Sequence, residues 1–171
     1  MNGLKKVTCC TAFMLAPFGM AVTAQGAKIS GPISTTLNIS EDSQLVGDVT
    51  CTVSGAPCIS IGAPRVTLSL NGYTITGLAD SQTGCSGGAT NGEQGIAVDT
   101  QNGVTIRGPG LVQRFRQFGI FLVDSSFSTV TGVTLSTNCF SGIIVIAGSD
   151  NQLQGIVSVR NGNISNPCGG I

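Results

Sequence analysis

The sequence predicts an all-β fold in which about five short coils stack into a parallel solenoid. Two landmarks recur along the chain with a common period of about 23 residues, as expected for a solenoid. Only 9% of the residues are charged and 25 are glycine. Val, Ile, Thr and Ser recur in short alternating runs, a pattern that favours strands and tight turns over helices.

Residues 1–24 have the form of a secretory signal peptide. Two lysines precede an apolar run, and Val22-Thr23-Ala24 offers a small-residue cleavage site. A membrane anchor is the alternative, but Pro17 and Gly19 interrupt the run, and a span needs about 20 consecutive apolar residues. We therefore expect a secreted or periplasmic protein with no membrane span after processing.

The remaining chain is predicted to be one weakly acidic domain. Without the two lysines of the signal peptide, six basic residues face eight acidic ones. This balance indicates neither nucleic acid nor an anionic membrane as a partner. We expect an N-terminal cap and first coil at 25–57, followed by β-helix coils at 58–171 with a loop insertion at 77–92.

The first landmark is a Gly-Ile pair, and the second is an aliphatic residue followed by any residue and then Gly. The Gly-Ile pairs start at residues 95, 119, 142 and 170, in steps of 24, 23 and 28 residues. The second landmark starts at Ile106, Val130 and Leu153, in steps of 24 and 23. Towards the N-terminus, Leu45 and Leu70 fit the second landmark, and segments 37–39 and 58–59 fit the first. Five successive coils result, and Ile171 begins a sixth.

Each coil is expected to begin with a strand that has one buried face, because apolar residues alternate with outward ones after each first landmark. The glycine of the second landmark is interpreted as a turn position with positive φ. The coils would stack about 4.8 Å apart and form a continuous core. The predicted buried residues are Ile59, Ile61, Ile96, Val98, Ile120, Leu122, Ile143 and Val145.

Three stretches, Val66–Gly77, Gly103–Val112 and Ser128–Val145, resemble coils of the right-handed parallel β-helix proteins of the pectin-lyase-like superfamily. The resemblance covers residues 33–171 and implies a right-handed parallel β-helix and polysaccharide chemistry on acidic sugars. The sequence contains no His and no Trp, and it has no Asp-rich motif of the inverting-hydrolase kind, since Asp80, Glu93, Asp99, Asp124 and Asp150 are scattered singly. None of the superfamily's catalytic residues is therefore carried over, and no catalytic residue is predicted.

Arginines and aspartates are the candidate binding residues. Arg114 and Arg160 share one column with Thr137, since each is 23 residues from the next, and Arg116 lies beside them. These arginines would bind carboxylates of an acidic polysaccharide, and Asp99 and Asp124 would hold Ca²⁺. The alternative is solvated surface charge, because two isolated acids make a poor Ca²⁺ site. No other cofactor and no metal-binding motif is predicted.

Two further features have a functional and a structural interpretation. Phe121 belongs to an outward apolar stripe with Val123, Ile144 and Ile146, which would be a binding surface. Alternatively, the stripe is covered by loop 77–92 or by chain beyond Ile171. Asn138 and Asn161 are 23 residues apart. For them we favour stacked side-chain amides that bond along the column over contact with a ligand.

Five cysteines remain after removal of the signal peptide. Cys139 and Cys168 lie three and two residues before their Gly-Ile pairs, so we predict a disulfide between them. Cys51 and Cys58 bracket a turn and form a second candidate pair, which leaves Cys85 alone in its loop.

Two functions from different classes remain. The first is an exported β-helix protein that binds or processes an acidic polysaccharide, and the alternative is a non-catalytic surface or adhesive solenoid. Because Gly170-Ile171 repeats the opening of a coil, we also expect a truncated chain that self-associates through its C-terminal end. The alternative is that Cys168 fixes a finished end.

Overall fold

The protein is all-β in the computed structural model, which describes residues 26–79, 85 and 91–162. The predicted signal peptide, part of the predicted loop insertion and the segment from 163 lie outside these residues. Every regular element of the described chain is a strand, and no helix there is long and apolar enough to cross a membrane. The strands are β1 (Ala27–Ile33), β2 (Leu37–Ile39), β3 (Ser43–Cys51), β4 (Ile59–Ile61), β5 (Thr67–Ser69), β6 (Thr74–Thr76), β7 (Gln94–Asp99), β8 (Thr105–Gln113), β9 (Phe118–Val123), β10 (Thr129–Ser136), β11 (Ile143–Ile146), β12 (Gln152–Gln154) and β13 (Val157–Val159).

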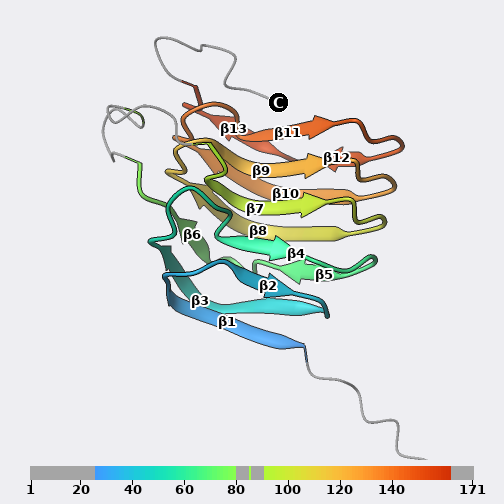
Figure 1. Ribbon diagram of the computed structural model, residues 1–171, viewed down its shortest axis with the longest axis horizontal. Coiled ribbons are helices and arrows are strands. Elements are labelled where there is room, and N and C mark those ends of the chain that lie inside the picture. Colours follow the sequence, from blue (N-terminus) through green and yellow to red (C-terminus); the bar gives the residue numbers. More distant parts are fainter. Residues whose placement is uncertain (1–25, 80–84, 86–90, 163–171) are drawn as a thin grey trace, which may run out of the picture.

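The strands form two sheets whose pairings are all parallel (Figure 1). The larger sheet has the order β1-β3-β5-β8-β10-β12, with β6 paired to β3 and β8 and β13 paired to β10. The smaller sheet has the order β11-β9-β7-β4-β2. Consecutive segments alternate between the sheets, so each sequence repeat adds one layer to both. This arrangement is compatible with a β-solenoid.

The segment predicted as cap and first coil, 25–57, contributes strands to both sheets. Its strand β1 is the edge of the larger sheet and its strand β2 is the edge of the smaller one. Strands β3, β8 and β10 are long, and each pairs with different neighbours through its first and second halves. The larger sheet is therefore bent midway along its strands.

The register of the smaller sheet follows the predicted period. Ile59, Ile96, Ile120 and Ile143 are successive partners, and all four are 0% exposed. The next inward positions, Ile61, Val98 and Leu122, are also buried, so the predicted inward face is confirmed for these seven residues. Val145 is only partly buried, since β11 is the last strand of this sheet in the described chain.

Two predicted landmarks in the larger sheet, at Leu45 and Leu70, are out of register with the later ones. Ile106 pairs with Leu68, and Leu68 pairs with Ser43, so each of these landmarks lies two residues too late. Leu70 is also buried, but it lies at the bend between β5 and β6, where Asn71 and Gly72 both have positive φ. The bends at Gly132 and Gly155 have a single residue with positive φ. Because the backbone of the earlier bend is different, its landmark is shifted by two residues.

Steric crowding explains why a glycine precedes the buried isoleucine in the later repeats, at Ile96, Ile120 and Ile143. An ideal Cβ on Gly119 would lie 2.5 Å from the carbonyl oxygen of Gly142 and 2.8 Å from Nδ2 of Asn138. Gly95 has equivalent close neighbours, one of which is the ring of Phe115. Real Cβ atoms do not approach other atoms so closely, so the Gly-Ile landmark is set by the packing of one repeat against the next.

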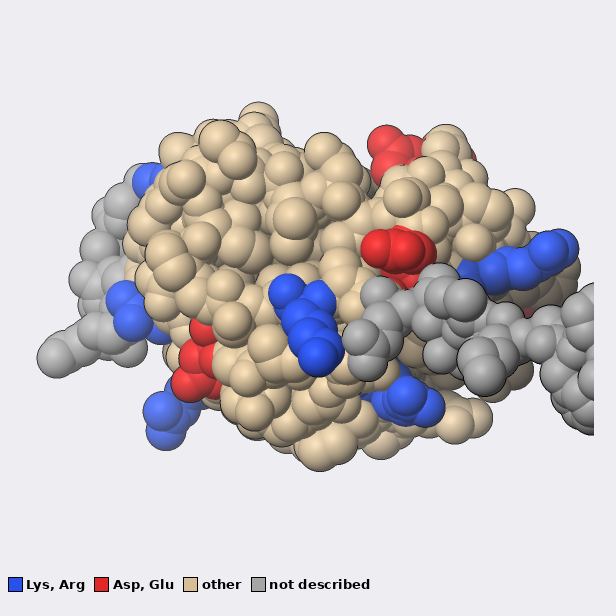
Figure 2. All heavy atoms as spheres, turned by 90° about the horizontal axis from the view of Figure 1, so that it is seen from below, with Lys and Arg blue, Asp and Glu red and all other residues tan. Residues whose placement is uncertain are grey.

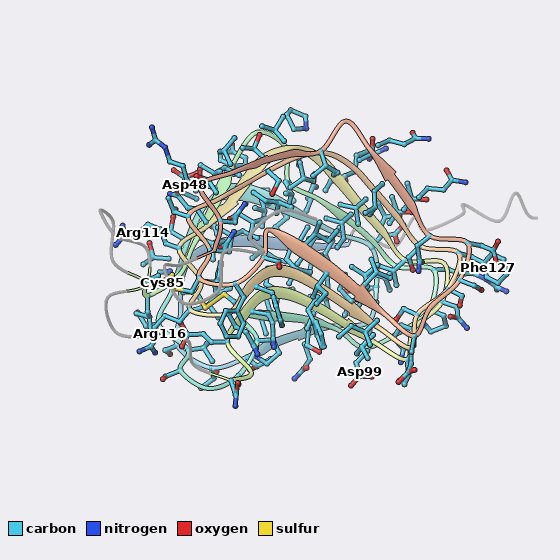
Figure 3. The ribbon with its side chains drawn as sticks, turned by 90° about the horizontal axis from the view of Figure 1, so that it is seen from above. Asp48, Cys85, Asp99, Arg114, Arg116 and Phe127 are labelled. Atoms are coloured by element: carbon cyan, nitrogen blue, oxygen red, sulfur yellow. A yellow bond between two sulfur atoms is a disulfide. The ribbon has the colours of Figure 1, made fainter. Side chains whose placement is uncertain are left out.

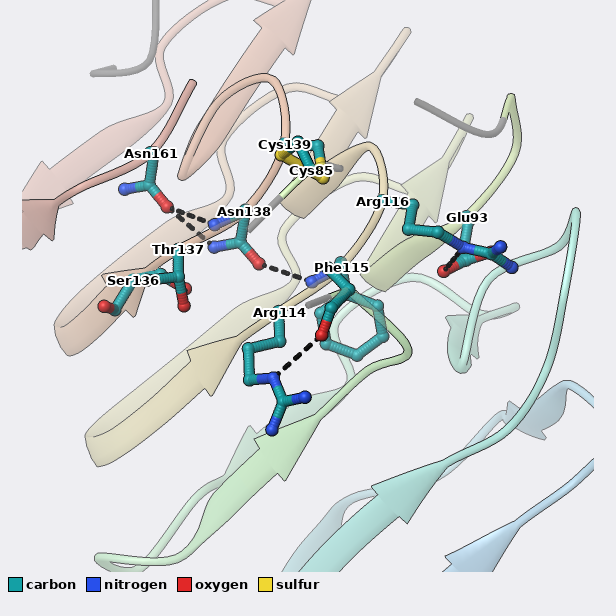
Figure 4. The surroundings of a disulfide bond; sticks show 11 residues. Cys85, Glu93, Arg114, Phe115, Arg116, Ser136, Thr137, Asn138, Cys139 and Asn161 are labelled. Atoms are coloured by element: carbon teal, nitrogen blue, oxygen red, sulfur yellow. Dashed lines mark hydrogen bonds and ion pairs between the residues drawn. A yellow bond between two sulfur atoms is a disulfide. The ribbon is translucent and has the colours of Figure 1, made fainter. Parts of the chain in front are cut away.

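Two disulfides are present among the described residues. Cys51 and Cys58 are bonded, as the sequence suggested. The predicted pairing of Cys139 with Cys168 is wrong, because Cys139 is bonded to Cys85 (Figure 4). Cys139 is fully buried behind the end of β10, and the chain before β7 brings the Cα of Cys85 within 5.2 Å of it.

Candidate functional site

The turn that leads from the larger to the smaller sheet holds all three predicted arginines, and we call it the arginine turn (114–117, 137–142 and 160–162). Arg114, Thr137 and Arg160 form the predicted column. The backbone N–H of Arg114 donates to the carbonyl of Ser136, and that of Thr137 donates to Val159. All three residues have positive φ, between 54° and 61°, so the backbone of each is in the left-handed region.

Two of these arginines make internal contacts (Figure 4). Arg114 donates through Nε to the carbonyl of Ala79 at 2.9 Å. Arg116 binds both carboxylate oxygens of Glu93 at 2.6–2.9 Å and also donates to Ser54. Glu93 is 1% exposed. The hydrogen bond to Glu93 raises the pKa of Arg116. Arg116 therefore neutralises a buried acid, and its guanidinium is not available to a ligand.

The predicted aspartates lie in the opposite turn, which leads back from the smaller to the larger sheet. Asp99 ends β7, and Asp124 directly follows its register partner Val123 in β9. Both side chains are exposed. Figure 3 shows Arg114 and Arg116 at one end of the cross-section and Asp99 and Phe127 towards the other. The fold therefore does not bring the candidate arginines and aspartates together. On the face shown in Figure 2, basic and acidic side chains are likewise scattered among uncharged residues.

Two other kinds of site find no support in the described chain. One is a metal site, and the other is ligand binding by Asn138 and Asn161. No three His, Cys, Asp or Glu residues in it lie close enough together to hold a metal ion. Asn138 accepts from the backbone N–H of Phe115 and donates to Oδ1 of Asn161, at 3.0 and 2.9 Å. These amides form the stacked column that we favoured from the sequence, and they satisfy buried backbone groups.

Phe121 lies in an apolar stripe on the outer face of the smaller sheet. Its register partner on β11 is Ile144, and Val123 is beside Ile146. The ring of Phe121 stacks on Phe118 with centroids 5.5 Å apart. Ile146 is 43% exposed, so part of the stripe is in contact with solvent.

The sequence reasoning missed a groove on the outer face of the larger sheet. Its volume is about 270 Å³, and it is lined by Gly26, Asp42, Ser43, Gln44, Thr67, Ser69 and Arg107. Arg107 lies on β8 and donates through Nη2 to Oγ of Ser69 at 3.1 Å. Asp42 accepts from the backbone N–H of Thr67. The groove therefore combines one cation, one anion and several hydroxyl and amide groups.

Arg107 is the charged donor that the groove offers to a ligand. Its side chain is exposed, and among the described residues it has no hydrogen-bond partner other than Ser69. Four of its five N–H donors are thus available. The sequence did contain a signal for Arg107. It is the middle residue of a second landmark, and because Ile106 before it points inward, Arg107 must point outward from the strand.

Comparisons of the chain with models of protein families, with curated proteins and with solved structures found no match.

Proposed function

We propose that the protein is an exported right-handed parallel β-helix of about five coils that binds an acidic polysaccharide and does not cleave it. The parallel pairing of all strands, the period of about 23 residues and the resemblance to pectin-lyase-like coils support this architecture. Two disulfides are consistent with an oxidising compartment, which supports export.

The groove at Arg107 is the observation that carries the binding proposal. A guanidinium with unused donors binds a carboxylate through two parallel hydrogen bonds. The neighbouring Gln44, Thr67 and Ser69 supply neutral groups that suit sugar hydroxyls. Cleavage is less well supported, because the chain has no His and Arg is a poor general base.

The test is the binding of polygalacturonate, with neutral dextran as the control polymer. We expect titration calorimetry to show binding of polygalacturonate alone, which weakens with added salt. Arg107→Gln should reduce the affinity about tenfold, since one charge-assisted contact is lost. Arg65→Gln is the matched control, because Arg65 is exposed and lies outside the groove. Equal affinities of the two variants would contradict the proposal, and release of new reducing ends would show processing instead.

The apolar stripe favours a second candidate, a non-catalytic adhesive solenoid. Phe121 and Ile144 are only partly buried and Ile146 is exposed. In that case a Phe121→Ser, Ile144→Ser variant should lose self-association in light scattering while it keeps its affinity for polygalacturonate. Unchanged self-association would exclude the stripe as the interface.

A further inference from the structure

The outer face of the larger sheet carries a column of outward side chains that crosses the groove. Successive parallel strands place its members in register, one per strand. We call it the cation column, and in order it consists of Lys28, Gln44, Ser69, Arg107, Thr131 and Gln154. Lys28 and Arg107 are its only charged members. They are three strand spacings apart, or roughly 14 Å.

A second column beside it carries the only anion of the groove. Thr67, Thr105, Thr129 and Gln152 are successive register partners. Asp42 precedes them, and its carboxylate accepts from the N–H of Thr67. Asp42 lines the same groove as Gln44 and Ser69, the two neutral positions between the cations, and it lies two residues before Gln44 in the chain. A ligand carboxylate at either position would be repelled by Asp42.

Building on the proposed function, we infer that the ligand is a linear heteropolysaccharide in which two neutral sugars separate successive carboxylated ones. An extended pyranose chain rises by close to one strand spacing per sugar, so a polymer along the cation column places one sugar over each strand. Lys28 and Arg107 would each bind one carboxylate. The two intervening sugars would bind Gln44 and Ser69 through their hydroxyls. A polymer with a carboxylate on every sugar, such as polygalacturonate, would still bind through Lys28 and Arg107, but more weakly, because two of its other carboxylates would lie close to Asp42.

Two synthetic linear tetraglucosides of equal charge test this inference. One carries glucuronate at both ends, and the other carries glucuronate at the two middle positions. We expect the end-charged isomer to bind wild-type protein about tenfold more tightly in calorimetry, since only its carboxylates match both cations. Lys28→Gln should remove this preference, whereas Arg65→Gln should leave it unchanged.

Equal affinity for the two isomers, or tighter binding of the middle-charged isomer, would overturn the inference. So would a preference that survives Lys28→Gln. If polygalacturonate still binds through Arg107 in any of these cases, the proposed function holds and only the spacing is wrong. If neither the isomers nor polygalacturonate binds, both proposals fail.

Discussion

Left-handed backbone conformations at single residues mark where the chain leaves each sheet. Thr100, Asp124 and Ala147 follow successive strands of the smaller sheet and all have positive φ. Arg114, Thr137 and Arg160 also have positive φ, and each follows a strand of the larger sheet. The sequence predicted positive φ at the glycine of the second landmark. Gly72, Gly132 and Gly155 have it, whereas the prediction is wrong for Gly47 and Gly108. The non-glycine positions could not be predicted, because their conformation is imposed by stacking on the neighbouring repeat.

Gly119→Ala tests the crowding between repeats. The added methyl group would overlap the carbonyl of Gly142 and the amide of Asn138, so we expect a loss of about 1–3 kcal/mol in the free energy of unfolding, as for other overpacked sites. Urea denaturation provides the measurement. Gly62→Ala is the matched control, since its only close neighbour would be the Ile39 carbonyl oxygen at 3.9 Å. Equal midpoints for the two variants would show that the repeats can move apart.

At the scale of elements, the Arg116–Glu93 pair joins three segments. Arg116 precedes β9, Glu93 precedes β7, and Ser54 lies in the loop between β3 and β4. Glu93 and Arg116 are one period apart, so the repeat itself contained the signal for this pair. An acid that lies one period before a base is placed on the adjacent repeat, so the pair could have been predicted from the sequence.

Arg116→Gln should destabilise the protein by about 3 kcal/mol, because it leaves the buried carboxylate of Glu93 without a counter-ion. The hydrogen bond to Glu93 raises the pKa of Arg116 above its ordinary value in the folded state. Its contribution is therefore fully present at every pH below the ordinary pKa of arginine and is lost only as the pH rises through the folded-state pKa. Urea unfolding at neutral and at mildly alkaline pH should give the same difference. The double variant Arg116→Gln, Glu93→Gln should recover part of the loss, and no recovery would argue against charge burial as the cause.

For the whole molecule, the inward face and the parallel order of strands could be predicted, whereas the disulfide pattern could not. The period places Ile96, Ile120 and Ile143 in one row because identical repeats stack in register. Cys85 lies in an insertion that has no counterpart in the other repeats, so its distance from Cys139 cannot be read from any period. The groove at Arg107 was missed because its lining comes from four segments of differing spacing.

Removal of the two disulfides should have unequal effects. In the loop-entropy model, the Cys85–Cys139 bond closes 54 residues and is worth about 4 kcal/mol. The Cys51–Cys58 bond closes 7 residues and is worth about 2 kcal/mol. Thermal unfolding of the two double Cys→Ala variants should therefore rank them in this order. Non-reducing peptide mapping should link Cys85 to Cys139, and a fragment that links Cys139 to Cys168 would contradict the structure.

The Cys85–Cys139 bond encloses β7, β8, β9 and β10 in one covalent ring. Its consequence appears when the protein is stretched by its two ends. The other repeats can peel away one after another, because each is held only by its neighbours. The ringed strands can lose their pairing but cannot lengthen, so the bond withholds 54 residues of extension until it is reduced. Under tension, the length that the protein can reach would therefore depend on the redox state of this one bond.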